Sequence, residues 1–431
     1  MHTPKRGASV SRRAFITAAA AGAAALTLGM PAPAIAKKSR IVYWSPLDPK
    51  ANNSRSKAEA AMIDVFRKKH PDIEVEVQPV PWQVMGQQVI QAVLAGNGPD
   101  VAQLSTTNLP DQVGAGAAAP LNDYVDKYLT PAQKADFLLP HENTTYDGQT
   151  MGYYWSTLLG NGFWYLKDLV DGAPPMDWNK LPPYLKAAGD KGKVPGFLIG
   201  LSQQGNGIGI TNPLIPMLWA CGAEYVMPDG RLGFNNANGE KAFEWLVSLV
   251  RQYKIAPESI VSLTRDNVLD AMKARRSVSA VLTSNIVSSA RESLGNSMGM
   301  AKQPGPVGPC PAFATGKFLI MTKSCQEQEA AGLFIQAMVS PEAQLANAKI
   351  GSEIPVLKSV AKDPYFSTPE AADIRFALDY MAQNPHPFKY PMRTDYLQTQ
   401  TALATQQIFK GVPIKDALGK LSDQWDVARK G

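Results

Sequence analysis

The apolar residues between positions 40 and 104 alternate between two spacings, and this alternation limits the possible folds more than any other feature of the chain. Short β-rich or every-second-residue stretches are typical of strands, and the stretches between them carry apolar stripes at helical spacing. The predicted order is strand, helix, strand, helix, strand, over residues 40–44, 56–69, 73–78, 84–94 and 100–104. Such an order predicts an open α/β sheet.

Polar residues follow two strands of this predicted sheet. Ser45 comes directly after Trp44 at the end of the first strand, and Ser105, Thr106 and Thr107 come after the last one. Ligands of open α/β sheets bind beyond the carboxyl ends of the strands. We therefore expect these residues near a ligand, with a simple capping turn as the alternative for residues 105–107.

The rest of the chain is predicted to contain long loops and further helices. Glycine and proline crowd into residues 300–316, which predicts an extended segment that crosses between parts of the fold. Ser340 followed by Pro341 predicts a helix start, because serine is favoured as N-cap and proline at the first helical position. Apolar stripes at helical spacing occupy residues 240–251, 326–339 and 414–425.

The composition excludes several classes of protein. A length of 431 residues suggests roughly two to three domains. The formal charge of +6 is concentrated in residues 1–36, which hold four basic residues and no acidic one, so that 39 basic and 37 acidic residues remain. A nearly neutral body carries no electrostatic footprint for nucleic acid. Three cysteines and four scattered histidines predict neither a disulfide scaffold nor a metal or cofactor site.

The N-terminus has the features of an export signal. Arg12-Arg13 precedes an apolar stretch over residues 14–30, and Ala34-Ile35-Ala36 has the small–x–small pattern of a cleavage site. The paired arginines resemble the twin-arginine motif, with an ordinary secretory signal as the alternative. We expect a twin-arginine-type signal peptide over residues 1–36. With no cysteine at the cleavage point and no later membrane span, the exported chain should be soluble in the periplasm without a lipid anchor.

A series of short motifs recurs in the order of a known family. They are Trp44 and the stretches 65–75 (VFRKKHPDIEV), 80–82 (VPW), 95–101 (AGNGPDV), 119–124 (APLNDY), 146–149 (YDGQ), 152–157 (GYYWST), 165–169 (YLKDL), 340–344 (SPEAQ) and 354–356 (IPV). Through them the chain resembles the extracellular solute-binding proteins of ABC importers, in the carbohydrate-type group that includes maltose-binding protein. It departs from that group at Thr315-Gly316-Lys317 and in the Gln203–Ile210 loop.

The resemblance implies a fold and a domain plan. The fold would be the α/β, two-lobed type II periplasmic binding protein, with a central ligand cleft and hinge strands. The first lobe would take residues 37–154 and the second would take residues 155–300. Residues 301–345 would cross over and return to the first lobe, and residues 346–431 would complete the second.

The resemblance also implies a function without catalysis or cofactor. The protein would capture a small solute (a sugar, a polyol or a sugar phosphate) and deliver it to the membrane subunits of an ABC permease, acting as a monomer. It would not bind nucleic acid.

Sugar sites need aromatic faces for stacking and amide or hydroxyl groups for the sugar hydroxyls. Of the eight tryptophans, Trp44 and Trp155 are the preferred candidates, and we expect them to stack on the ligand from opposite lobes. Trp82 and Trp219 come next. For each of the four, a place in the hydrophobic core is the alternative.

Further polar candidates lie late in the chain. Asn285 follows a β-rich run and stands where relatives have a ligand-contacting turn. Arg393 and Tyr396, near the start of a C-terminal helix, resemble another contact region of the family, although a surface role is the alternative for Arg393.

A secreted serine hydrolase is the competing function. Residues 295–299 match G-x-S-x-G around Ser297, and Asp379 and His386 follow in the chain order of a hydrolase triad. A nucleophile elbow needs a strand before the serine and a helix after it. The sequence predicts a helical segment before Ser297 and a proline-rich stretch soon after it, so the binding function is favoured.

Overall fold

The computed structural model describes residues 39–204, 208–383, 386 and 388–430, all within one compact unit. The predicted signal peptide and part of the Gln203–Ile210 loop lie outside the described residues. No helix among the described residues is long and apolar enough to span a membrane.

The first sheet is built from the alternating segment at the start of the chain. Its order is β2-β1-β3-β12-β4, with β7 paired to β12. β1 (Ser39–Ser45) pairs in parallel with β2 (Ile73–Pro79) and β3 (Val101–Ser105), which confirms the predicted open α/β sheet. The other strands are β4 (Ala118–Ala119), β7 (Tyr153–Leu159) and β12 (Ala314–Thr322). The helices of this part are α1 (Ser54–Lys69), α2 (Trp82–Leu94), α3 (Leu109–Gly114), α4 (Pro131–Ala135), α10 (Gln328–Met338) and α11 (Pro341–Gly351).

The second sheet has the order β11-β8-β10-β9. Its strands are β8 (Gly162–Leu166), β9 (Phe197–Leu198), β10 (Ser279–Leu282) and β11 (Met298–Lys302). The helices that follow or surround it are α5 (Leu181–Gly192), α6 (Ile208–Ala220), α7 (Ala237–Arg251), α8 (Arg265–Lys273), α9 (Val287–Leu294), α13 (Thr394–Phe409) and α14 (Ile414–Ala428). A separate two-stranded ribbon pairs β5 (Thr145–Tyr146) with β6 (Gln149–Thr150).

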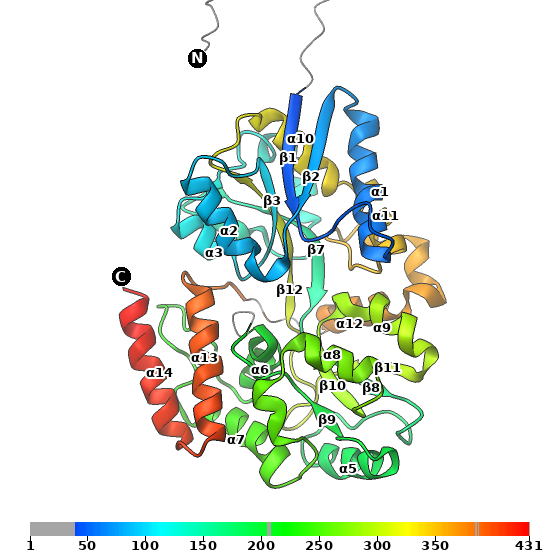
Figure 1. Ribbon diagram of the computed structural model, residues 1–431, viewed down its shortest axis with the longest axis vertical. Helices are drawn as coiled ribbons and strands as arrows, with labels where there is room; N and C mark the ends of the chain where they lie inside the picture. Colours follow the sequence, from blue (N-terminus) through cyan, green and yellow to red (C-terminus); the bar gives the residue numbers. More distant parts are fainter. Residues whose placement is uncertain (1–38, 205–207, 384–385, 387, 431) are drawn as a thin grey trace, which may run out of the picture. The chain divides into compact units, whose positions relative to one another are not determined.

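Two hydrophobic cores divide this unit into two lobes. One core forms around the first sheet and the other around the second sheet. The antiparallel pair β7 and β12 runs between the lobes, as Figure 1 shows. Beyond these strands, the side chain of Asn161 accepts a hydrogen bond from the backbone N–H of Phe313 (2.8 Å) and donates one to the carbonyl of Pro311 (3.0 Å). The two crossing segments are therefore joined by side-chain as well as ladder hydrogen bonds.

The segment after α11 packs against the first lobe, whereas the sequence predicts it in the second lobe. The predicted domain plan places residues 346–431 in the second lobe, whereas Ile354, Val356 and Phe366 are buried in the first core. Gln344 holds this segment in place, because its side chain accepts from the N–H of Val356 (2.9 Å) and donates to the carbonyl of Trp155 (2.9 Å). The chain passes α12 (Ala372–Gln383), whose buried residues also join the first core, and contributes to the second core again from Tyr390 onward.

Several helices begin at residues that favour helix starts. The hydroxyl of Ser340 accepts from the N–H of Ala343, with Pro341 at the first position of α11, as predicted. Thr264 and Asn267 form a reciprocal capping box at the start of α8. These caps fix where each helix begins.

We expect Gly316→Ala to destabilise the protein, because Gly316 lies in β12 where it pairs with β7. A Cβ there would stand 2.6 Å from the carbonyl oxygen of Ser156 and 2.9 Å from the ring of Tyr154. Relieving this overlap should lower the free energy of unfolding by about 1–3 kcal/mol, measured by chemical denaturation. Gly419→Ala in α14 is the control, since a Cβ there meets nothing within 4 Å and should stabilise by about 0.5–1 kcal/mol. Equal stability of the two variants would contradict the tight strand crossing.

Candidate functional site

A cavity of about 320 Å3 lies between the two lobes. Residues of the first lobe line it at the ends of β1 and β3 and at the starts of α1 and α2, and residues of the second lobe line it from α6, α8 and the turn after β10. A second cavity of about 290 Å3 shares Trp82, Gln83, Ser105, Thr107 and Arg265 with it, so that the two form one continuous cleft.

Hydroxyl groups line the cleft at the carboxyl end of β3. The Oγ of Ser105 lies 2.5 Å from the Oγ1 of Thr107, and the Oγ1 of Thr106 lies 2.5 Å from the Oγ1 of Thr315 on the crossing strand. Each hydroxyl keeps a further donor or acceptor capacity for a partner in the cleft. The structure thus brings the three predicted residues 105–107 together at the predicted end of the sheet.

Amide groups line the cleft from the second lobe. Asn285 lies in the single turn Ser284–Ile286 after β10, where its Oδ1 accepts a hydrogen bond from the hydroxyl of Thr283 (2.5 Å). Asn212 of α6 is only 5% exposed, and its Oδ1 has no hydrogen-bond partner among the described residues. A buried oxygen without a partner costs free energy unless water or a ligand satisfies it.

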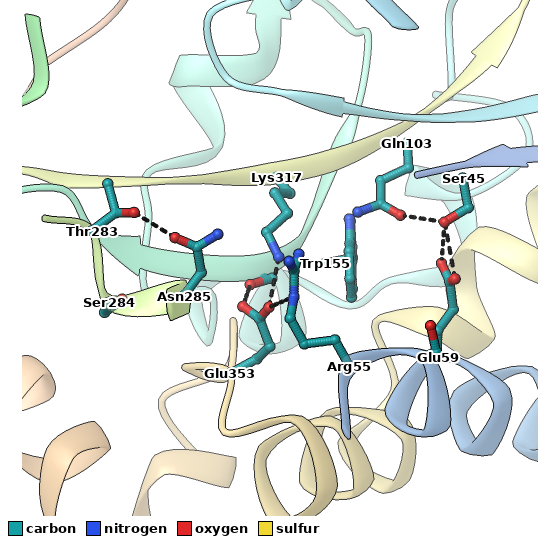
Figure 2. A network of polar contacts seen from close by, with 12 residues as sticks. Ser45, Arg55, Glu59, Gln103, Trp155, Thr283, Ser284, Asn285, Lys317 and Glu353 are labelled. Carbon is teal, nitrogen blue, oxygen red and sulfur yellow. Dashed lines mark hydrogen bonds and ion pairs between the residues drawn. The ribbon is translucent and has the colours of Figure 1, made fainter. Parts of the chain in front are cut away.

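A buried cluster of charges forms one wall of the cleft (Figure 2). The Nζ of Lys317 lies 2.7 Å from Oε1 of Glu353, and these side chains are 2% and 3% exposed. Arg55, the second residue of α1, places its Nε 3.3 Å from the same oxygen, and Ser156 donates to Oε2 of Glu353 (2.6 Å). Lys317 also lies over the ring of Trp155, 4.9 Å from its centroid. Lys317 and Arg55 both line the cavity.

Burial and pairing shift the protonation of this cluster. Burial disfavours the ammonium and lowers the pKa of Lys317 to about 8, although Glu353 opposes the shift. Burial alone would raise the pKa of Glu353, but the charges of Lys317 and Arg55 outweigh it and hold that pKa below its ordinary value. Glu353 is therefore ionised, and two cations share one carboxylate.

A second buried carboxyl lies beside the cleft on α1. Glu59 accepts hydrogen bonds from the hydroxyls of Tyr43 (2.8 Å) and Ser45 (2.7 Å). The Oγ of Ser45 also lies 3.0 Å from Oε1 of Gln103, as Figure 2 shows. Burial raises the pKa of Glu59 to about 7, because the hydrogen bonds offset only part of the desolvation.

The structure separates the four candidate tryptophans. Trp82, the first residue of α2, is half-buried and lines both parts of the cleft. Trp44 packs against the first core and donates to Oε1 of Gln78 (2.8 Å), and Trp155 is 1% exposed in that same core. Because both belong to the core of the first lobe, Trp44 and Trp155 do not face each other from opposite lobes. Every residue of β7, which holds Trp155, is buried. Trp219 stacks on His386 in the second lobe, with ring centroids 3.9 Å apart.

Arg393 and Tyr396 line a different cavity, of about 510 Å3, together with Asp111 of α3. Arg393 precedes α13 with a left-handed backbone (φ 61°), and the backbone N–H of Asp395 donates to the carboxylate of Asp111 (3.3 Å). This contact joins the two lobes at a place separate from the cleft that holds Asn285 and residues 105–107.

Sequence reasoning missed the charged residues of the cleft. In the sequence, Lys317 stands out only as a departure from the family pattern, although a lysine directly before the apolar run at residues 318–321 is an unusual strand residue. Arg55 and Arg265 stand in the first turns of helices, where no local pattern marks a residue as facing a cleft. Only the folded arrangement brings these three cations together.

The residues predicted for the serine-hydrolase alternative lack the surroundings that a hydrolase triad needs. Ser297 ends a single turn that follows helix α9 and precedes strand β11, which is the reverse of the strand–serine–helix order of a nucleophile elbow. His386 stacks on Trp219 and lies 3.3 Å from Glu224. Among the described residues, no group of three or more His, Cys, Asp or Glu side chains could hold a metal ion.

Comparison with known families shows to which family the chain belongs. Residues 61–373 match the bacterial extracellular solute-binding protein family, and the chain belongs to this family. A binding protein of Brucella abortus is 25% identical over 309 residues, which cover 70% of this chain and 73% of the relative. The family is one of binding proteins, which agrees with the favoured function and gives no support to the hydrolase.

Solved structures share the fold. Maltose-bound MalE3 of T. maritima superposes with a TM-score of 0.77 at 20% identity, covering 90% of this chain and all of the other. A substrate-binding protein of Thermotoga lettingae bound with α-D-tagatose gives 0.76 at 18% identity, covering 90% and 98%. The cyclic α-maltosyl-1,6-maltose binding protein of Arthrobacter globiformis gives 0.75 at 19%, covering 91% and 99%. The predicted two-lobed α/β fold is confirmed.

We expect Glu59→Gln to remove part of the pH dependence of stability. A carboxyl whose pKa is raised on folding stabilises the protein below its unfolded pKa, and this contribution is lost as the pH rises through the folded pKa of about 7. Between about pH 4.5 and pH 7 the native protein should therefore lose stability, on the order of 2–3 kcal/mol from this group. Urea denaturation at pH 5 and pH 7.5 measures the loss.

The variant should lose less stability than the native protein over this range. Glu74→Gln, at an exposed position of β2, is the control and should keep the native pH dependence. Parallel pH profiles of native protein and Glu59→Gln would show that Glu59 titrates normally.

Proposed function

We propose that the protein is the periplasmic solute-binding component of an ABC importer, which captures a sugar, a polyol or a sugar phosphate and delivers it to the membrane permease. One observation carries the proposal: both lobes contribute hydroxyl, amide and indole groups to a single cleft at the carboxyl ends of β1 and β3. Hydroxylated solutes need this combination. The protein would act as a monomer and without a cofactor.

The candidate contacts come from both lobes. Trp82 and residues 105–107 of the first lobe and Asn285 of the second are the predicted residues that line the cleft, and Asn212, Arg55, Arg265 and Lys317 join them. A ligand bound to both lobes would favour a closed arrangement by its differential contacts, with β7 and β12 as the hinge strands. The permease would then distinguish loaded from empty protein.

Similar proteins support the class of solute. The structural neighbours include proteins bound with maltose and with α-D-tagatose. Their identities of 20% and 18% establish the fold rather than the ligand, so the carbohydrate-like solute remains our proposal and rests on the lining of this cleft.

A melting-temperature screen over sugars, polyols and sugar phosphates tests this function, because a ligand that binds only the folded state raises the melting temperature. With a solute so identified, Trp82→Ala should weaken binding by on the order of 1–3 kcal/mol, or about 5–150-fold, because the exposed indole face of the cleft is lost. Calorimetric titration measures the change.

Trp44→Ala is the matched control, since Trp44 belongs to the same lobe and is also half-buried but contacts Gln78 instead of the cleft. Its affinity should equal that of the native protein. Weaker binding by Trp44→Ala with native affinity in Trp82→Ala would place the ligand elsewhere, and no thermal response to any solute would refute the proposed function.

Export belongs to the same proposal. Residues 1–36 would act as a twin-arginine signal that is removed after transport, leaving the protein in the periplasm without a lipid anchor. The family description as extracellular supports export but not the route.

Replacing Arg12 and Arg13 with lysine should leave the precursor in the cytoplasm, because the twin-arginine route requires the paired arginines. Cell fractionation and immunoblotting measure where the protein accumulates. The control is the double variant Lys5→Arg and Arg6→Lys, which shows any general effect of changed N-terminal side chains. Unchanged periplasmic yield of the Arg12/Arg13 variant would favour the ordinary secretory route.

A further inference from the structure

The lining of the 320 Å3 cavity between the lobes is positively charged. Arg55 and Lys317 line it from the first lobe and Arg265 lines it from the second, and none of the described lining residues is an aspartate or glutamate. Behind this lining, Glu353 compensates one of the two charges on Arg55 and Lys317. The carboxyl of Glu59, whose pKa burial raises to about 7, compensates part of the other charge. Arg265, which is 26% exposed, has Asp266 as its ion-pair partner at 3.1 Å, and Asp266 lines only the neighbouring part of the cleft.

Three helices also begin at this cavity. Arg55, Trp82 and Arg265 are first-turn residues of α1, α2 and α8, which have 16, 13 and 9 residues. The N-terminal end of a helix carries unpaired N–H groups and a partial positive charge. At α2 no side chain caps these groups, and its first turn has no acidic residue. Helix ends and side chains therefore add to the same positive potential.

One side chain in this wall has an unused hydrogen-bond donor. The Nε of Arg55 is buried and lies at ion-pair distance from Glu353, but it makes no hydrogen bond among the described residues. A guanidinium N–H prefers a charged acceptor, and Arg55 shares the carboxylate of Glu353 with the hydrogen bonds from Lys317 and Ser156. The Arg55 side chain as a whole is 30% exposed, so an oxyanion in the cavity would meet the outer N–H groups of its guanidinium rather than Nε.

We propose that the solute of this cleft carries an oxyanion, a carboxylate or a phosphate, in addition to hydroxyl groups. The inference rests on the proposed function and narrows it to sugar acids and to phosphates of sugars or polyols. The charged group would lie against Arg55, Lys317 and Arg265, and the hydroxyls would meet residues 105–107 and Asn285. A neutral sugar would leave the excess positive charge of a closed cleft without a partner, which is unfavourable in a desolvated site.

Matched pairs of probes test the inference. The purified protein is titrated with glycerol and glycerol 3-phosphate, with glucose and glucose 6-phosphate, and with galactose and galacturonate, by melting temperature and calorimetry. In at least one pair the anionic member should bind about tenfold tighter or more, the effect of one charged hydrogen bond. The phosphate pairs and the carboxylate pair distinguish the two sources of the oxyanion.

A pair of arginine variants locates the charged group. Arg265→Gln should weaken binding of the anionic probe by about tenfold more than it weakens binding of the neutral partner. Arg231→Gln is the matched control, because Arg231 also pairs with a neighbouring aspartate of the second lobe but does not line the cleft. The control should bind the anionic probe like the native protein.

The possible results separate the two proposals. Neutral members that bind as tightly as their anionic partners would overturn the oxyanion and leave the carbohydrate function standing. Equal losses of neutral and anionic binding in Arg265→Gln would also overturn it. If no member of the panel binds, this result counts against the proposed function itself. It then also overturns the proposal of an anionic solute.

Discussion

The buried ion pair between Lys317 and Glu353 is the interaction on which the two-lobed arrangement depends. Lys317 belongs to crossing strand β12, Glu353 belongs to the segment after α11, and Ser156 of β7 donates to the same carboxylate. Removing one member of such a pair leaves an uncompensated buried charge, which typically costs about 3–5 kcal/mol. The pair therefore fixes three segments, distant in the sequence, against one another where the lobes meet.

The pairing with Glu353 also explains why a buried lysine is tolerated in β12. An apolar pair of the same volume would hold the segments at least as well, because desolvating two charges is costly. The charges have a second use here, since Lys317 and Arg55 reach the cleft while Glu353 stays behind them. Under the proposed function, structural and binding contributions would come from the same residues, and strand β12 would carry part of the proposed site.

The sequence was most informative where local pattern and fold agree. The alternation over residues 40–104 predicted the parallel strands β1, β2 and β3. Residues 105–107 line the cavity at the carboxyl end of β3, where ligands of open α/β sheets bind, and their contact with a ligand stays a prediction. The sequence was less informative for tryptophans, because an indole at a strand position looks the same whether the strand is half-exposed or, as β7 is, buried throughout. The cations of the cleft come from elements far apart in the sequence, so that no spacing could relate Arg55, Arg265 and Lys317.

The distribution of these cations over the two lobes bears on how the cleft would respond to a solute. Arg55 and Lys317 stand on the first lobe and Arg265 on the second, and like charges repel as the lobes approach. An oxyanion between them would convert this repulsion into attraction, and the effect would grow as water leaves the closing site and the local dielectric falls. A neutral solute would supply hydroxyl contacts but would leave the electrostatic repulsion between the cations of the two lobes in place. The charge pattern would thus link recognition of the solute to closure, since the proposed oxyanion would also be the group that lets the lobes come together.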